Sequence, residues 1–255
     1  MTRPVPRVLA TSGGFRMTER WGVVEPAGLL RAALQLTGKA RPRLALVPTA
    51  TGDDRTTLAR LYGAFRGWSV DVCHLELFAM PNGDPRTLLL EQDVIWVGGG
   101  SVANLLAVWR THGLDVVMRE AWEAGIVLSG VSAGSICWHL GGPTDSFGPV
   151  LRPVTDGLGL LPYGNGVHYD KEEQRRPLLH TLVADGTLPR SYATDDTTGV
   201  LYEGTEPVAV LTDAMKGTDD YDAADPDGPS AYVVERDGSG AVVETRLPPG
   251  PVPAG

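Results

Sequence analysis

Residues 125–140 read GIVLSGVSAGSICWHL, and this stretch decides the fold. Residues 125–130 form an apolar run of strand length, whereas 135–140 carry apolar residues at helical spacing. Between them lies a Gly-x-Ser-x-Gly pattern with Ser132 at its centre. Small residues on either side of a serine let the backbone turn sharply from strand to helix, so that the hydroxyl stands above the edge of a sheet. We therefore predict a strand, a tight turn that presents Ser132, and a helix.

The same alternation continues outward over the first two thirds of the chain. Apolar or β-branched runs predict strands at 7–12, 44–49, 69–74 and 94–97. Stretches with apolar residues at helical spacing predict helices at 26–36, 53–66, 102–111 and 114–124. Strands that alternate with helices are typical of parallel βα units. We therefore predict an α/β fold of three layers, with a mostly parallel central sheet and helices on both of its faces.

From residue 199 onward the pattern changes to short strands separated by Gly, Asp and Pro. These are predicted as antiparallel strands that close the same domain, at 199–202, 207–211, 230–235 and 241–246. Residues 1–247 are thus expected to form one domain, followed by a flexible tail at 248–255. The acidic loop 218–227, TDDYDAADPD, is expected to be solvated.

Composition restricts the class of partner. The chain has 255 residues, and its 22 Lys and Arg against 31 Asp and Glu give a net charge of −9. An acidic surface without a cationic cluster repels phosphate backbones, so no nucleic-acid partner is expected. The sequence has neither the roughly 20-residue apolar run of a membrane span nor a signal-peptide pattern. Cys73 and Cys137 form no disulfide framework or metal-binding pair. We expect a cytoplasmic protein without a membrane partner.

An activated serine hydroxyl needs a base, and the sequence offers five histidines. His168 lies in the glycine-rich loop 164–170, GNGVHYD, and loops on a rigid scaffold are where catalytic side chains collect. We therefore take His168 as the candidate base. The other four stand at the ends of predicted elements or within amphipathic runs, where packing or surface roles are commoner: His74, His112, His139 and His180.

The base in turn needs a carboxylate that orients it. Asp145, after the predicted elbow helix, and Asp170, two residues after His168, compete for this role. In an extended loop, residues two apart point the same way, so Asp170 is also a candidate for contact with the substrate. The residues alone leave both assignments open.

Two groups of backbone amides are candidates for stabilising an oxyanion. The amide of Ala133 lies at the predicted helix N-terminus, where unpaired N–H groups and the helix dipole favour negative charge. The turn Gly98-Gly99-Gly100-Ser101 follows the strand at 94–97, at the edge where open α/β sheets bind ligands. The sequence contains neither a GxGxxG fingerprint nor a P-loop, so these glycines favour an amide donor over a nucleotide site.

Four motifs together resemble the peptidase E and cyanophycinase family of serine peptidases: VIWVGGG at 94–100, NLL at 104–106, GVSAGS at 130–135 and HYD at 168–170. The resemblance extends over residues 7–211 and implies the class I glutamine amidotransferase-like fold, with Ser in place of Cys at the elbow. It implies that Ser132 is the nucleophile, His168 the base and Asp145 the third member of a triad. It also implies that the amides of Gly100 and Ala133 form the oxyanion hole.

Two positions depart from the aspartyl dipeptidase branch of that family. Ser101 stands where those members have Asn, and Glu172 stands where they have an Arg thought to hold the substrate aspartate. An acidic side chain cannot pair with a substrate carboxylate. The expected substrate-binding residues are therefore Ser101, Asp170 and Glu172, with the side-chain preference of the substrate left open.

The expected function is hydrolysis of short peptides, Asp-X dipeptides or related ones, through an acyl-enzyme and without a metal or organic cofactor. A small peptide is the expected partner, and the resemblance is compatible with a homodimer. One alternative is an α/β-hydrolase esterase, although Asp145 and His168 follow Ser132 more closely than that fold normally places them. A glutamine amidotransferase would need Cys at the elbow, and Cys137 lies beyond it in the predicted helix. A catalytically inactive binding relative is the remaining alternative.

Overall fold

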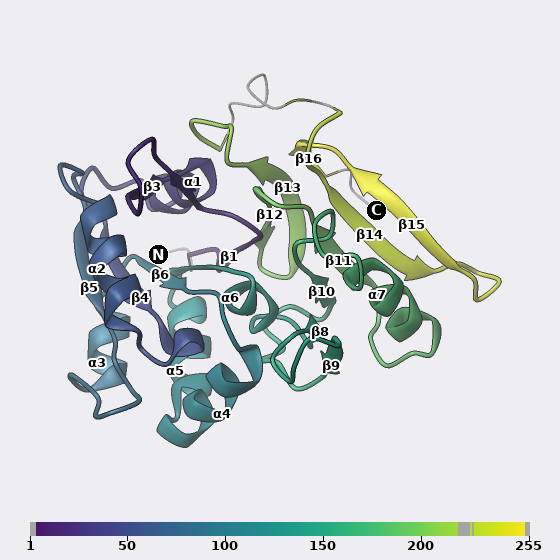
Figure 1. The fold of residues 1–255 in the computed structure, drawn as a ribbon, viewed down its shortest axis with the longest axis horizontal. Coiled ribbons are helices and arrows are strands. Elements are labelled where there is room, and N and C mark those ends of the chain that lie inside the picture. Colours follow the sequence, from purple (N-terminus) through teal and green to yellow (C-terminus); the bar gives the residue numbers. More distant parts are fainter. Residues whose placement is uncertain (1–3, 219–224, 226, 253–255) are drawn as a thin grey trace.

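The computed structural model describes residues 4–218, 225 and 227–252. Its centre is an eight-stranded sheet in the order β16-β13-β12-β1-β7-β6-β4-β5 (Figure 1). Neighbouring strands run parallel through β1 (Arg7–Thr11), β7 (Val127–Val131), β6 (Val94–Val97), β4 (Arg43–Val47) and β5 (Asp71–His74). Antiparallel strands extend the sheet beyond β1: β12 (Thr198–Glu203), β13 (Glu206–Thr212) and β16 (Gly250–Pro251). The predicted mostly parallel sheet with antiparallel C-terminal strands is confirmed.

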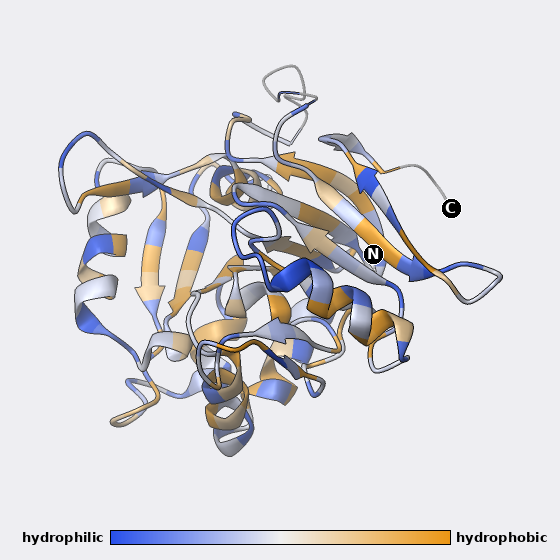
Figure 2. Ribbon diagram, turned by 45° about the vertical axis from the view of Figure 1, so that its right-hand side comes forward, coloured by the Kyte–Doolittle hydropathy of each residue, from blue (hydrophilic) through white to orange (hydrophobic). Residues whose placement is uncertain are grey.

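Helices cover both faces of this sheet. Because side chains alternate along a strand, Leu9 of β1 enters one core, while Val8 and Ala10 enter the other. The core around Leu9 is closed by α1 (Gly28–Gln35) and α2 (Arg55–Ala64). The opposite core is closed by α3 (Pro85–Leu90), α4 (Val102–His112) and α5 (Leu114–Glu123). Figure 2 shows apolar residues concentrated on the strands and on the packed helices, which confirms the three-layer prediction.

Polar side chains fix where several helices begin. Asp54, Asp84 and Ser101 are the N-caps of α2, α3 and α4, and each accepts a hydrogen bond from the backbone amide three residues further on. The cap at Ser101 starts α4 directly after the glycine turn 98–100. This turn therefore stays at the carboxyl end of β6.

A second sheet contains β10 (Gly164–Gly166), β11 (Ser191–Thr194), β14 (Ala231–Arg236) and β15 (Val242–Leu247), in that order. Helix α7 (Arg175–Ala184) packs against β14, at the right of Figure 1. The sequence predicts strands near β14 and β15 but no separate sheet, and it misses β10 and β11. Strand β10 has three residues, two of them glycine, so it is too short for a period-two pattern to be visible.

The remaining elements are short. Strand β2 (Phe15–Met17) pairs with β3 (Val24–Pro26), and β8 (Gly142–Thr144) pairs with β9 (Arg152–Val154). A 3-10 turn, η1 (Thr49–Thr51), follows β4. Helix α6 (Ala133–Ile136) stands where a longer helix at 135–140 was expected; the chain leaves the helix before Gly141 and Gly142.

The C-terminal segment contains a short strand. Within the expected tail 248–255, β16 pairs with Ala209 and Val210 of β13, and residues 253–255 lie outside the described part of the chain. Residues 219–224 and 226 of the acidic loop also lie outside it, so its expected solvation stays a prediction. No helix within the described ranges has the length and hydrophobicity needed to cross a lipid bilayer.

Candidate active site

Ser132 is held in a strained turn directly after β7. Its φ of 57° and ψ of −112° lie in a region that residues other than glycine rarely adopt. Its amide donates a hydrogen bond of 3.1 Å to the carbonyl of Thr11 at the end of β1. Helix α6 begins at the next residue, Ala133. The strand-turn-helix geometry predicted for the elbow is present, at the carboxyl edge of the parallel sheet.

The two glycines of the elbow are required by the close approach of β6. A Cβ atom at Gly130 would lie 2.7 Å from the carbonyl oxygen of Val97, and one at Gly134 would lie 2.7 Å from the carbonyl carbon of Val97. Both separations are shorter than van der Waals contact. The elbow therefore packs against β6 only with glycine on both sides of Ser132.

His168 comes from the loop after β10 and also has a strained backbone, with φ of 51°. Its amide donates a hydrogen bond of 3.1 Å to Oγ of Ser12. Ser12 follows Thr11, whose carbonyl holds the amide of Ser132. The backbones of the two candidate residues are thus tied to consecutive positions at the end of β1.

The carboxylate beside His168 belongs to Asp196. Nδ1 of His168 lies 2.5 Å from Oδ1 of Asp196. Because an ionised carboxylate only accepts hydrogen bonds, Nδ1 carries the proton and Nε2 is left to accept one. This is the tautomer that a general base acting on a serine hydroxyl requires.

This arrangement differs from the one expected for Asp145. Asp145 is exposed in the loop after β8, and within the described part of the chain no hydrogen bond joins it to His168. Its loop is held toward α4 instead, because Oγ of Ser146 accepts a hydrogen bond of 3.3 Å from the amide of Ala103. Asp196 reaches the histidine because β10 and β11 are parallel neighbours, so the loops that follow them leave from the same edge.

One feature of the sequence points to Asp196. Two consecutive acids, Asp195 and Asp196, directly follow the apolar-polar run at 191–194. Recognising that run as a strand, β11, would have placed both acids at a strand's carboxyl end. The pairing of β11 with β10 could not be predicted from the sequence, because neither strand has a pattern long enough to show its neighbour.

Asp170, expected near the substrate or the base, supports Asp196. Its Oδ1 accepts a hydrogen bond of 2.8 Å from the amide of Asp196, and its Oδ2 lies 3.3 Å from Nζ of Lys171. Burial opposes ionisation of Asp170, but the amide and the ammonium outweigh it, so its pKa lies below the ordinary value. The loop that carries His168 therefore also holds the backbone of Asp196 in place.

Asp195 points away from Asp196 into the second sheet. It is 4% exposed, and its Oδ2 accepts hydrogen bonds from the amide of Ser230 at 3.0 Å and the hydroxyl of Tyr232 at 3.1 Å. Burial, reinforced by the charge of Asp170, raises the pKa of Asp195 above its ordinary value despite those donors. Of the two consecutive acids, one is a buried anchor and the other contacts the histidine.

The glycine turn lies against the elbow. A Cβ atom at Gly99 would lie 3.3 Å from Cβ of Ser132, and Gly100 has φ of 131°, which favours glycine. Among the described residues, neither Gly100 nor Ala133 donates its amide to another group. Both amides are therefore free to receive an oxyanion beside Ser132.

Ser101 and Glu172, the other expected substrate-binding residues, already have partners. Ser101 caps α4. Oε2 of Glu172 lies 2.7 Å from Nε of the buried Arg175, and the amide of Glu172 donates to the carbonyl of His168 at 3.0 Å. A cavity of about 400 Å³ next to this loop is lined by Asp145, Pro149, Leu151, Glu172, Glu173 and Gln174. The carboxylates of Asp145, Glu172 and Glu173 thus line a cavity beside the segment that follows His168.

Three of the other histidines contact residues outside the candidate triad. His139 is fully buried, its Nδ1 lies 2.9 Å from the carbonyl of Ser135, and burial lowers its pKa to about 4. His74 contacts the hydroxyl of Tyr62 at 2.7 Å. His180 contacts Glu244 at 2.8 Å.

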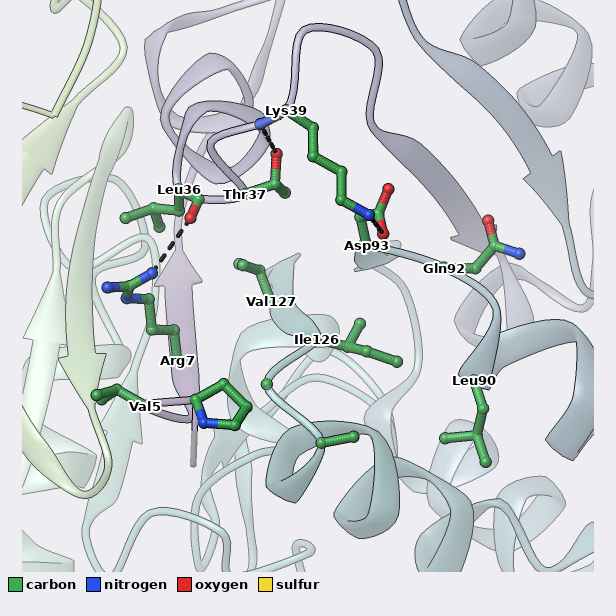
Figure 3. Close-up of a pocket in the computed structure, with 13 residues that line it drawn as sticks. Val5, Arg7, Leu36, Thr37, Lys39, Leu90, Gln92, Asp93, Ile126 and Val127 are labelled. Atoms are coloured by element: carbon green, nitrogen blue, oxygen red, sulfur yellow. Dashed lines mark hydrogen bonds and ion pairs between the residues drawn. The ribbon is translucent and has the colours of Figure 1, made fainter. Parts of the chain in front are cut away.

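A cavity of about 550 Å³ lies at the opposite end of the parallel strands (Figure 3). It is lined by residues at the beginnings of β1 and β7, including Arg7 and Val127, and by Lys39, which pairs with Asp93 at 2.7 Å. Cavity volume therefore does not mark the candidate site, whereas backbone strain and hydrogen bonding do. Within the described ranges, no three His, Cys, Asp or Glu side chains converge as metal ligands would.

A strained serine at a strand-to-helix turn, together with a histidine that a carboxylate orients, is typical of serine hydrolases. Comparison with known proteins identifies the family. The sequence model of Peptidase family S51 matches residues 8–209. The chain belongs to this family and is a serine-type peptidase, as the resemblance predicted.

Individual relatives also carry peptidase names. The chain is 41% identical over 186 residues to "Uncharacterized peptidase YgaJ" of Bacillus subtilis, covering 72% of this chain and 77% of the relative. It is 32% identical over 177 residues to "Peptidase E" of Streptomyces coelicolor, covering 64% of this chain and 70% of that one.

Solved structures share the fold. A peptidase from an acI-B1 actinobacterium superposes with a TM-score of 0.67 at 17% identity, covering 97% of this chain and 96% of that chain. A putative peptidase E from Listeria monocytogenes EGD-e gives a TM-score of 0.57 at 17% identity, covering 82% and 98%. At this identity the likeness concerns the fold alone.

Proposed function

We propose that the protein hydrolyses short peptides through a triad of Ser132, His168 and Asp196. Asp196 takes the role that the sequence resemblance assigned to Asp145. The amides of Gly100 and Ala133 form the oxyanion hole, as expected from the sequence. Asp170 is a positioning residue that holds the backbone of Asp196.

In the first half of the reaction, Oγ of Ser132 attacks the scissile carbonyl carbon while its proton moves to Nε2 of His168. The amides of Gly100 and Ala133 donate to the carbonyl oxygen as it becomes negative. The C–N bond then breaks, and His168 gives its proton to the departing amine. The acyl group remains as an ester on Ser132.

In the second half, His168 takes a proton from a water molecule whose oxygen attacks the ester carbonyl. Collapse of this tetrahedral intermediate releases the carboxylic acid and returns the proton to Oγ of Ser132. Asp196 stays ionised in both halves and stabilises the imidazolium.

The observation that carries the proposal is the 2.5 Å contact between Nδ1 of His168 and Oδ1 of Asp196. It fixes the tautomer that leaves Nε2 as the acceptor. The links of Ser132 to Thr11 and of His168 to Ser12 support it, because they bring both candidate residues to one end of β1.

The test is Ser132→Ala, assayed on a panel of dipeptides and tripeptides. Loss of the nucleophile of a triad costs on the order of 10⁴-fold or more in kcat. Ser135→Ala is the matched control, because that hydroxyl lies three residues further on, in α6, and donates to Oδ1 of Asn165 at 2.9 Å. It is expected to keep turnover within about tenfold of the wild type, since a triad effect is far larger. Retained turnover in Ser132→Ala would refute the proposal.

A serine-reactive phosphonate gives a second readout that needs no knowledge of the substrate. Mass spectrometry of the labelled protein should find the adduct on Ser132. An adduct on another serine, or rapid labelling of Ser132→Ala, contradicts the assignment.

A further inference from the structure

Arg176, on α7, contacts Tyr169 of the loop after β10 and two residues of the second sheet, Tyr232 and Glu244. Its guanidinium carbon lies 4.4 Å from the ring centre of Tyr169 and 4.8 Å from that of Tyr232. Its Nη1 pairs with Oε1 of Glu244. The hydroxyl of Tyr169 donates a hydrogen bond of 2.8 Å to Oε2 of the same carboxylate. We call Tyr169, Arg176, Tyr232 and Glu244 the Arg176 cluster.

The Arg176 cluster contacts the sequence neighbours of both His168 and Asp196. It includes Tyr169 and binds Asp195. Tyr169 follows His168 and is 3% exposed. The hydroxyl of Tyr232 donates a hydrogen bond of 3.1 Å to Oδ2 of Asp195, which precedes Asp196. A single guanidinium therefore contacts the ring that anchors the histidine loop and the ring that anchors the aspartate loop.

Both loops contain strained backbone that needs such anchoring. His168 has φ of 51°, and Thr197, the residue after Asp196, has φ of 65°. Strained conformations of this kind persist only where the surrounding structure over-determines them. Charge-assisted hydrogen bonds and cation–π contacts are strong, directional restraints in a partly buried setting. In the Arg176 cluster these contacts are made by Tyr169, the residue after His168, and by Asp195, the residue before Asp196.

Two members of the cluster lie beyond the part of the chain that matches the family. The match ends at residue 209, whereas Tyr232 lies on β14 and Glu244 on β15. The β14–β15 hairpin supplies no residue to the proposed triad. Through Tyr232 and Glu244 its side chains nevertheless reach both loops that carry it.

We infer that the Arg176 cluster is a positioning device that fixes the geometry between His168 and Asp196, and that the β14–β15 hairpin is thereby part of the catalytic apparatus. This inference rests on the proposed function, since it has meaning only if His168 is the base. The cluster residues are positioning residues, because they act through Tyr169 and Asp195 rather than on reacting atoms.

The test compares Arg176→Met and Glu244→Ala with the wild type. A misplacement of the order of 1 Å costs up to about 10²-fold in rate, so kcat is expected to fall about 10- to 100-fold while KM changes less than about threefold. The rate of phosphonate labelling at Ser132 should fall in parallel.

A conservative variant separates positioning from packing. Glu244→Gln keeps an oxygen that accepts from Tyr169 but loses the charge that pairs with Arg176, so it should retain more activity than Glu244→Ala. Should Glu244→Ala fail to fold, Tyr232→Phe replaces it, since that change removes only the hydroxyl that bonds to Asp195. Tyr232→Phe should lower kcat and the labelling rate without lowering the melting temperature by more than a few degrees.

Glu235→Gln is the matched control. Glu235 lies on β14 and pairs with Arg190 at 3.3 Å on the exposed part of the hairpin, so its kcat and labelling rate should equal those of the wild type. Unchanged kcat and labelling rate in folded Arg176→Met and Tyr232→Phe would overturn the inference. The proposed function would survive that result if Ser132→Ala and Asp196→Asn still lose turnover, and it would fail by itself if they do not.

Discussion

His168 and Asp196 each stand two residues beyond the end of a strand, and the two strands are parallel neighbours in the second sheet. Their side chains meet at 2.5 Å. Ser132, by contrast, directly follows β7 of the main sheet. The candidate site therefore lies where the edges of two sheets meet, and the end of β1 joins them through the hydrogen bonds of Thr11 and Ser12.

Asp196→Asn should abolish most activity, whereas Asp145→Asn should not. An amide at position 196 can donate to Nδ1 and so favours the wrong tautomer of His168, a change that costs on the order of 10⁴-fold in triads of this kind. Asp145 is exposed and lies in the cavity near Glu172, so its neutralisation should alter kcat less than about fivefold, as for exposed charges. Steady-state kinetics of both purified variants decide between the two acids.

A large loss in Asp145→Asn together with near-normal Asp196→Asn would restore the assignment that the resemblance implied. Circular dichroism and melting curves of both variants serve as the control, because each substitution preserves side-chain size.

Asp170→Ala should lower kcat more than Asp170→Asn does. The asparagine keeps an oxygen that accepts from the amide of Asp196, whereas the alanine leaves that amide without its 2.8 Å partner. Because the substitution acts through Asp196 and not on the substrate, kcat should fall about tenfold in Asp170→Ala with KM little changed. Equal kinetics for the two variants would show that this hydrogen bond does not position Asp196.

The nucleophile elbow could be predicted from the sequence because its requirements are local. Positions 130 and 134 must be glycine because Val97 lies too close for a Cβ atom, and Ser132 stands between them. The glycine-serine-glycine spacing in the sequence therefore indicates this packing directly. The glycine turn before Ser101 could be placed for the same reason, since it joins a clear strand to a clear helix.

The third member of the candidate triad depends on a contact between residues 28 positions apart, which the two consecutive acids at 195 and 196 do not reveal by themselves. Strands β10 and β11 have three and four residues, so their pairing comes from tertiary packing and not from their own pattern. The loop after β8 offered an aspartate at a plausible distance along the chain. In the structure that aspartate is exposed and lines the cavity beside Glu172, while Asp196 contacts His168.

Asp213 should make stability depend on pH in a way that Asp213→Asn removes. Its Oδ1 accepts a hydrogen bond of 3.0 Å from the amide of Leu29, and its Oδ2 accepts one of 2.9 Å from the amide of Gly14. Burial raises the pKa of Asp213 to about 6, although both amides oppose this shift. The ordinary value is near 4, so between about pH 4 and 6 the folded protein holds a proton that the unfolded chain has released.

The contribution of Asp213 to stability is therefore full below about pH 4 and is lost as the pH rises through 6, a loss of about 3 kcal/mol. Asp213→Asn cannot titrate, so the difference in unfolding free energy, variant minus wild type, should become more favourable to the variant from pH 4 to pH 7. Urea unfolding at several pH values measures this slope. A constant difference across that range would show that the carboxyl group titrates normally.

Substrate preference should follow the carboxylates around the cavity beside the His168 loop. Asp145, Glu172 and Glu173 line it, and an anionic group placed there meets like charge. For peptides matched in length that carry Lys, Gln or Glu at one position, kcat/KM should therefore decrease in that order at the position whose side chain reaches the cavity.

Asp145→Asn and Glu173→Gln should each reduce the Lys-to-Glu ratio of kcat/KM about two- to fivefold, as expected for exposed charges, and added salt should reduce it further. Glu172 is left unchanged in this test because it pairs with Arg175. A preference for Glu peptides, or a ratio that neither substitution alters, would show that the substrate does not enter this cavity.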